Sequence, residues 1–120
     1  MNVNDFLKKI DCKCGRTHEC AIKSVCIEDG AIFKLAKLIK EYDSVLLVAD
    51  ENTFNACGEK VENAIANKIK KKVIFSGKTI LIPNEQAIKT VQDNLEGIDL
   101  IIAVGSGVMQ DLCKCVSFYN

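Results

Sequence analysis

Two glycines stand at the point where an apolar run ends. The run 100–104 is followed by Gly105, Ser106 and Gly107, and helical spacing begins near Val108. Glycines at such a corner let the main chain approach a pyrophosphate, and the unpaired N–H groups of the next helix face its negative charge. The third glycine of the GxGxxG fingerprint is replaced by Gln110. The pattern alone leaves two interpretations open, a phosphate-binding turn or a tight corner of an α/β domain.

A carboxylate follows a second apolar run. Asp50 comes directly after the stretch 44–49, SVLLVA, which is typical of a parallel strand covered on both faces. An acidic corner of this kind also occurs in phosphorylation receiver domains. Those domains need a further aspartate at the end of the following strand, where this chain has Ser76 and Gly77. The receiver interpretation is therefore rejected.

Four potential zinc ligands crowd into the stretch CKCGRTHEC. They are Cys12, Cys14, His18 and Cys20, and zinc sites use four such groups. The CxC spacing holds two sulfurs on a tighter arc than CxxC, and no second CxxC follows. Seven cysteines, an odd number, without a signal peptide indicate reduced thiols. We expect thiols in a turn and no bound metal, with a small zinc-stabilised domain as an alternative.

The composition limits the class of protein. A chain of 120 residues, 48% of them hydrophobic, is long enough for one core, so residues 1–120 are expected to form a single domain. The 16 basic and 16 acidic residues balance, which argues against nucleic-acid partners. No apolar run is long enough to span a bilayer, and the N-terminus lacks the apolar core of a signal peptide. We expect no membrane association and a cytoplasmic location.

Strands and helices alternate along the chain. Strands are predicted at residues 21–27, 45–50, 72–76 and 99–104, and residues 79–83, TILIP, form a short extended piece. Asp29 is predicted to cap a first helix whose inner residues are Ile32, Leu35, Ala36 and Ile39.

Two more helices are predicted before the last strand. The second helix begins near Asn52 or Thr53 and carries the lysine run 68–72 mostly at its C-terminal end; its inner residues are Val61, Ala64, Ile65 and Ile69. Asn84 is predicted to cap the third, with Ala87, Ile88, Val91 and Leu95 inward. This order predicts an α/β fold of three layers with a mainly parallel sheet, whose ligands sit at the carboxyl ends of the strands.

Several of these segments together resemble a known family. In order and spacing, CKCGRTHECAIKSVCIEDGAIFKLAKLI, VLLVADENTFNACGEKV, LIPNEQAIKTVQDNL and DLIIAVGSGVMQDLCKCVSF are similar to the N-terminal half of sn-glycerol-1-phosphate dehydrogenases. That family belongs with the iron-dependent alcohol dehydrogenases, glycerol dehydrogenases and dehydroquinate synthases. The family pattern Gly-Ser-Gly-Thr-Ile-Asn-Asp-Leu-Thr-Lys reads GSGVMQDLCK here, so Val108, Met109 and Gln110 depart from it. The resemblance includes the CxCGxxH stretch without giving it a role.

The resemblance implies a Rossmann-like domain that binds NAD or NADP. It places five residues around the pyrophosphate, namely Gly105, Ser106, Gly107, Val108 and Met109. It also implies that Asp50 accepts hydrogen bonds from the adenosine ribose, which favours NAD because a carboxylate repels a 2′-phosphate. Asp111, three residues before Lys114, either faces the cofactor, as in the family, or complements the helix dipole as a first-turn carboxylate.

The resemblance also implies a helical second domain that this sequence does not contain. In the family that domain supplies an aspartate and two histidines to a catalytic Zn²⁺ or Fe²⁺, whereas the single histidine here is His18. We therefore expect a truncated cofactor domain with no catalytic residues of its own, inactive alone. The alternative is an interaction module that keeps the fold without binding a cofactor. In either case the surface that the second domain covers in the family is a candidate for self-association.

Overall fold

The computed structural model describes residues 3–78 and 81–120. It divides into two compact units, the first ending at Ala31 and the second running from Ile32 to Asn120. Each unit is described by itself. No helix in the described ranges is long and apolar enough to cross a membrane.

The first unit is built around a small hairpin. A 3-10 helix, Val3–Leu7, precedes the two-residue strands β1, Ile10–Asp11, and β2, Thr17–His18. The strands are antiparallel, with Ile10 opposite His18 and Asp11 opposite Thr17. The hydroxyl of Thr17 donates to Oδ1 of Asp11 over 2.9 Å, which joins the two strands through their side chains as well.

The predicted strand at residues 21–27 is wrong. This segment has no regular secondary structure, and Ile22 and Ile27 are exposed. Its main-chain groups find another partner: the side-chain amide of Asn4 donates to the carbonyl of Val25 and its oxygen accepts from the Val25 N–H. The side-chain amide of Asn4 thus forms the pair of hydrogen bonds that a neighbouring strand would otherwise supply to Val25. The alternation of apolar and polar residues does not lead to strand pairing here.

The second unit contains a parallel sheet of three strands, as the sequence predicts for this part of the chain. They are β3, Val45–Asp50, β4, Ile69–Phe75, and β5, Leu100–Ala103. Both neighbours of β3 run parallel to it, in the order β4-β3-β5. The predicted strands at 45–50 and 99–104 are confirmed, and β4 begins three residues before its predicted start.

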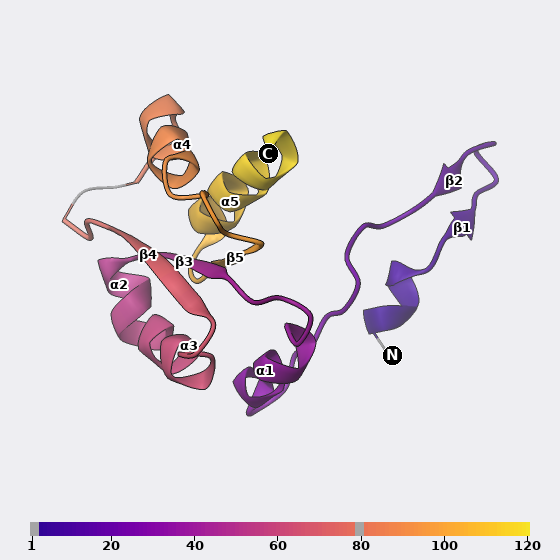
Figure 1. Ribbon diagram of the computed structural model, residues 1–120. Coiled ribbons are helices and arrows are strands. Elements are labelled where there is room, and N and C mark those ends of the chain that lie inside the picture. Colours follow the sequence, from indigo (N-terminus) through magenta and orange to yellow (C-terminus); the bar gives the residue numbers. More distant parts are fainter. Residues whose placement is uncertain (1–2, 79–80) are drawn as a thin grey trace. The chain divides into compact units, whose positions relative to one another are not determined.

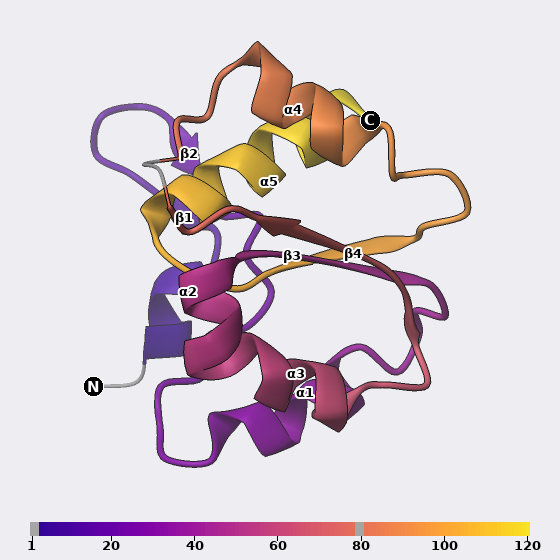
Figure 2. The ribbon, with the colours of Figure 1, turned by 90° about the vertical axis from the view of Figure 1, so that its left-hand side faces the viewer.

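The central strand β3 divides the core in two. Its residues Val45 to Ala49 are fully buried and point alternately to the two faces of the sheet. Leu46 and Val48 pack with residues of helices α4, Glu85–Gln92, and α5, Gly107–Tyr119. On the other face, Val45, Leu47 and Ala49 pack with residues of α3, Glu59–Ala64, and with Ile39, which follows α1, Leu35–Leu38. Helices therefore cover both faces of the sheet, and the expected three layers are present (Figures 1 and 2).

The first helix of this unit is shorter than predicted. A 3-10 helix, Ala31–Lys34, leads into α1, Leu35–Leu38, and the N-cap position of α1 is Lys34. The prediction that Asp29 is the helix cap is therefore wrong. Of the expected inner residues, Ile32, Leu35 and Ile39 pack in the core, whereas Ala36 is exposed.

A continuous helical stretch follows β3. It consists of α2, Glu51–Thr53, a π-helical segment, Phe54–Gly58, and α3, Glu59–Ala64. The helix starts directly after Asp50, one or two residues earlier than predicted. It also ends at Ala64, so placing the run 68–72 at its C-terminal end and Ile69 on its inner face is wrong, because residues 69–72 lie in β4. Val61 and Ile65 are buried as expected, whereas Ala64 is exposed.

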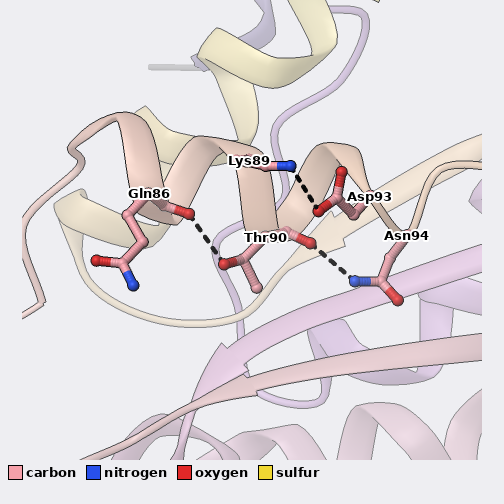
Figure 3. Close-up of polar contacts among 5 residues, drawn as sticks. All are labelled: Gln86, Lys89, Thr90, Asp93 and Asn94. Atoms are coloured by element: carbon pink, nitrogen blue, oxygen red, sulfur yellow. Dashed lines mark hydrogen bonds and ion pairs between the residues drawn. The ribbon is translucent and has the colours of Figure 1, made fainter.

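Helix α4, Glu85–Gln92, agrees with the sequence prediction. The side chain of Asn84 accepts a hydrogen bond from the N–H of Ala87 over 2.9 Å and so caps the helix. Ala87 and Val91 are buried. Figure 3 shows polar contacts along the same helix: Thr90 donates to the carbonyl of Gln86, Asn94 donates to that of Thr90, and Lys89 pairs with Asp93. In the predicted extended piece 79–83, Thr79 and Ile80 lie outside the described residues, and Leu81 to Pro83 have no regular structure.

Candidate functional site

The strand order places a crevice at the carboxyl edge of the sheet. Strands β4 and β5 lie on opposite sides of β3. The helices that follow β3 and β5 cover opposite faces, α2 and α3 one and α5, Gly107–Tyr119, the other (Figure 2). In open α/β sheets the ligand crevice forms where successive connections leave in opposite directions in this way. The candidate residues of the sequence lie at the ends of these two strands.

A cleft of about 340 Å³ opens at this edge. Its lining comes from the ends of all three strands and consists of Asp50, Asn52, Gly77, Lys78, Leu81, Ser106 and Val108. The structure thus brings together three residues proposed from the sequence, Asp50, Ser106 and Val108. The other four lining residues, Asn52, Gly77, Lys78 and Leu81, are not among the site residues predicted from the sequence. The rule that ligands sit at strand ends, applied to the predicted strand 72–76 as well, would have pointed to Gly77 and Lys78.

Asp50 has a structural role at this edge. Its Oδ1 accepts the N–H of Thr53 over 2.8 Å, and the hydroxyl of Thr53 accepts the N–H of Asp50 over 3.1 Å. This reciprocal capping box starts α2. Oδ1 alone serves the cap, and in the described part of the chain no hydrogen bond to Oδ2 is found. The second oxygen is therefore available to a ligand in the cleft.

The two glycines of the corner differ in their surroundings. Gly105 has a φ of 147°, which residues with a side chain rarely adopt, and a Cβ there would lie 2.9 Å from the side chains of Met109 and Thr53. Gly107 is different, because a Cβ at this position would have no heavy atom within 4 Å. Gly105 is thus required by packing, whereas Gly107 borders open space at the first turn of α5.

The N-terminus of α5 lacks a side-chain cap. Ser106 is the N-cap residue, and its hydroxyl makes no cap hydrogen bond. Met109 is fully buried, so its side chain is not accessible to a ligand in the cleft. Val108 is half-buried and lines the cleft. Gln110 donates from Nε2 to the carbonyl of Ala103 over 3.2 Å, linking the helix to the end of β5. The first N–H groups of a thirteen-residue helix thus lie where an anion would complement them.

Asp111 and Lys114 do not join this cleft. Both are exposed and neither is among the residues that line it. Because α5 begins at Gly107, Asp111 falls in the second turn, and the first turn carries no acidic residue. The interpretation of Asp111 as a first-turn carboxylate is therefore wrong.

The first unit contains a separate group of donors. The ligand atoms of Cys12, Cys14 and His18 all lie within 4.8 Å of one another, whereas Cys20 is not part of the group. The N–H of Cys14 points to Sγ of Cys12 over 3.5 Å, and hydrogen bonding by Cys14 lowers the pKa of the Cys12 thiol. All seven cysteines are free thiols, as the sequence predicts. Burial raises the pKa of Cys113, in α5, to about 11.

A parallel three-layer unit with a crevice of this kind is a Rossmann-like domain, the fold class expected from the sequence. Residues 26–120 match the model of the iron-containing alcohol dehydrogenase family. The chain therefore belongs to that family.

Two relatives agree with this assignment. The chain is 24% identical, over an alignment of 119 residues, to the glycerol-1-phosphate dehydrogenase (NAD(P)+) of Geobacillus stearothermophilus. This alignment covers 89% of the chain. Over 117 residues it is 26% identical to the protein of the same name from Geobacillus thermodenitrificans (strain NG80-2), again with 89% of this chain covered. The chain spans 28% of the length of each of these relatives.

The family name implies iron, and this chain does not offer the donors expected for it. The resemblance seen in the sequence implies a set of one aspartate and two histidines, and the chain has a single histidine, His18. In the described residues His18 lies beside two thiols of the hairpin. Softer thiolate donors of this type suit Zn²⁺ better than a catalytic Fe²⁺ held by imidazole and carboxylate. No catalytic step can be assigned to iron in this chain.

Proposed function

We propose that the unit Ile32–Asn120 binds the pyrophosphate and adenosine ribose of NAD or NADP in the cleft at the carboxyl edge of the sheet. The main-chain N–H groups at the start of α5 would hold the pyrophosphate, next to Ser106 and Val108. Oδ2 of Asp50 would accept hydrogen bonds from the ribose hydroxyls. When bound, the cofactor supplies a hydride acceptor or donor.

The surroundings of Gly107 carry this proposal. An uncapped helix start beside a cleft attracts an anion. The open space over Gly107 leaves room for a phosphate to approach the main chain. Membership of the iron-containing alcohol dehydrogenase family supports a nucleotide as that anion.

Two charges in the cleft act on the choice between NAD and NADP. Asp50 disfavours the 2′-phosphate of NADP by repulsion, and this favours NAD. Lys78 lines the same cleft and carries the opposite charge. We therefore propose a preference for NAD that Lys78 moderates.

The names of the two relatives support a proposal for the activity of the whole protein. Both are named glycerol-1-phosphate dehydrogenase (NAD(P)+). We propose that this chain is the cofactor-binding part of a similar oxidoreductase acting on glycerol phosphate or dihydroxyacetone phosphate. With no set of metal ligands for that reaction, the 120-residue chain is expected to bind nucleotide without turnover.

Calorimetric titration with NADH and NADPH tests the cofactor site. Gly107→Val places a branched side chain in the open space and should weaken both ligands at least several-fold. Asp50→Asn keeps an oxygen for the helix cap and removes the charge, so the ratio of NADH to NADPH affinity should fall. Lys78→Ala should weaken NADPH more than NADH. The proposal is wrong if the unaltered chain shows no binding at millimolar NADH, or if the Gly107→Val variant binds NADH with the same affinity as the unaltered chain.

A second candidate function is association through the outer edge of β5. This strand pairs with β3 on one side, and in the described ranges it has no partner on the other. A larger cavity of about 800 Å³, lined by β5 residues such as Leu100 and Ile101 together with the exposed face of α5, lies beside it. Unpaired strand edges of this kind join other chains readily. Sedimentation velocity over a range of concentrations would reveal a reversible dimer, whereas a monomer at every concentration removes this candidate.

A further inference from the structure

The hairpin of the first unit brings three metal-binding atoms together. The Sγ atoms of Cys12 and Cys14 and a ring nitrogen of His18 all lie within 4.8 Å of one another. Sγ of Cys14 lies 3.2 Å from Nε2 of His18. In a tetrahedral zinc site with Zn–S near 2.3 Å and Zn–N near 2.0 Å, neighbouring ligand atoms lie about 3.5–3.8 Å apart. The three atoms are therefore close to the spacing that a single ion requires.

The loop between the strands creates this spacing. Cys12 donates its N–H to the carbonyl of Arg16 over 3.0 Å, and Gly15 donates to the carbonyl of Cys12 over 3.1 Å. Gly15 has a φ of 85°, which reverses the chain within four residues. The second strand then returns His18 to the level of Ile10, next to the cysteines.

In the sequence, the number and spacing of the ligands disfavour a metal site. The CxC spacing and the lack of a second CxxC disfavour a closed site with four protein ligands. The geometry of the hairpin removes this objection, because the chain reversal at Gly15 adds His18 to the two sulfurs. Sites with three protein ligands and a water molecule in the fourth position are well established for zinc.

We propose that this hairpin binds one Zn²⁺ ion through Cys12, Cys14 and His18, with water in the fourth position. Two thiolates and one imidazole form a donor set that suits zinc. All three side chains are solvent-accessible, so the ion can enter without unfolding the unit. The N–H of Cys14, directed at Sγ of Cys12, stabilises that sulfur as a ligand. This site lies in the first unit and does not depend on the nucleotide cleft of the second.

Cys20 is excluded from the ligand set. It follows His18 by two residues, yet the described structure does not include it in the donor group. The proposal therefore differs from a site that uses all four donors of the stretch CKCGRTHEC. Cys57, an exposed thiol in the second unit, offers a matched control for any general effect of a cysteine substitution.

The test is titration of the full chain with Zn²⁺ under a non-chelating reductant, followed by the same titration with Co²⁺. We expect one zinc ion per chain, and a cobalt derivative with the sulfur-to-cobalt absorption of two thiolates. Cys12→Ser, Cys14→Ser and His18→Ala should each weaken Zn²⁺ binding by about a hundredfold or more. Cys20→Ser and Cys57→Ser should leave the affinity unchanged.

A second measurement on the unaltered chain protects the test against variants that fail to fold. One equivalent of Zn²⁺ should slow the alkylation of Cys12 and Cys14, located by peptide mass spectrometry, and leave Cys57 as reactive as before. The proposal is overturned if the reduced chain binds no stoichiometric zinc, if Cys14→Ser binds as tightly as the unaltered chain, or if zinc protects Cys57 equally. A strong loss in Cys20→Ser would overturn the three-ligand form of the proposal.

Discussion

A single carboxylate joins the beginnings of two strands at the edge opposite the cleft. Asp99 accepts the N–H of Asp43 through Oδ2 over 3.0 Å and that of Ser44 through Oδ1 over 2.9 Å. The Asp99 N–H in turn donates to the carbonyl of Ser44 over 2.9 Å. The hydrogen bonds from Asp43 and Ser44, with a smaller contribution from the charge of Lys68, hold the pKa of Asp99 below its usual value.

This lowered pKa predicts a pH-dependent contribution to stability. A carboxyl whose pKa is lower in the folded state stabilises the protein above its unfolded pKa, about 3.9 for aspartate. The contribution is then lost as the pH falls through the folded value. Urea denaturation should show Asp99→Asn to be less stable than the unaltered chain at pH 7, with a smaller difference near pH 3 and almost none below the folded pKa.

Asp93 offers a matched control for this experiment. Its carboxylate makes an exposed ion pair with Lys89 over 3.5 Å, for which little stabilisation is expected. Asp93→Asn should therefore leave the free energy of unfolding almost unchanged at every pH. An Asp99→Asn deficit of equal size at pH 7 and pH 2 would show that the charge of Asp99 is not its cause.

The glycines of the corner predict opposite results for the same substitution. Gly105→Ala forces a Cβ to within 2.9 Å of the Met109 and Thr53 side chains at an unfavourable φ. Overpacking of this kind costs about 1–3 kcal/mol of unfolding free energy. Gly107→Ala meets no atom within 4 Å and should change stability by less than about 0.5 kcal/mol. Denaturant titration measures both, and a Gly105→Ala variant as stable as Gly107→Ala would contradict the packing described for Gly105.

At the scale of elements, Lys68, which lies outside the helices, caps the C-terminal end of α1. Lys68 donates from Nζ to the carbonyls of Ile39, Lys40 and Tyr42 over 3.2, 3.1 and 2.7 Å. These carbonyls follow α1, and that of Ile39 also accepts the N–H of Tyr42 over 3.0 Å. A cation at a helix C-terminus also complements the helix dipole.

Removal of this cap should destabilise the second unit. Lys68 is half-buried, and hydrogen bonds from a charged donor contribute about 1.5–3 kcal/mol where they are protected from water. Lys68→Met is expected to lower the free energy of unfolding by about 1–2 kcal/mol, since part of that contribution is lost to solvent. Lys70→Met, at an exposed position in β4, is the control and should cost much less. Equal effects of the two substitutions would show that the three carbonyls do not depend on Lys68.

The same lysine shows why local patterns predict some elements and not others. β3 and α4 were predictable because their signals are local: an unbroken apolar run for a strand buried on both faces, and Asn84 before a regular apolar spacing. The prediction of a helix end for the lysine run is wrong because a charge pattern says nothing about partners distant in the sequence. Lys68 does complement a helix end, but the helix is α1, almost thirty residues earlier.

The candidate site was predictable in the same limited way. Asp50 and the corner at Gly105 follow the two clearest strands, and parallel topology brings such ends together. The role of Asp50 in capping α2 and the contact of Gly105 with Thr53 depend on three-dimensional packing, which the sequence pattern does not contain. The strand prediction for residues 21–27 is wrong for a related reason: alternation of apolar and polar residues indicates a strand only where a neighbouring strand is present to pair with it.

At the scale of the whole molecule, the size of the cleft limits what it can hold. Its volume of about 340 Å³ lies at the lower end of the range of ligand pockets, about 300–1,000 Å³. Its described lining offers partners for a phosphate and a ribose. A complete dinucleotide is larger than this cleft, so we expect one part of it to remain in solvent.

This limit predicts which fragments of the cofactor bind. NADH should bind with a dissociation constant in the high-micromolar to millimolar range, roughly 4–6 kcal/mol, which a few main-chain hydrogen bonds and one ribose contact can provide. ADP-ribose, which lacks the nicotinamide, should bind within about threefold of NADH, because the nicotinamide has no partner in the cleft. Nicotinamide mononucleotide should not bind measurably. Calorimetry with the three ligands measures this order, and Gly107→Val should weaken the binding of both NADH and ADP-ribose at least several-fold. A tenfold advantage of NADH over ADP-ribose would mean that the chain holds the nicotinamide at a place outside this cleft.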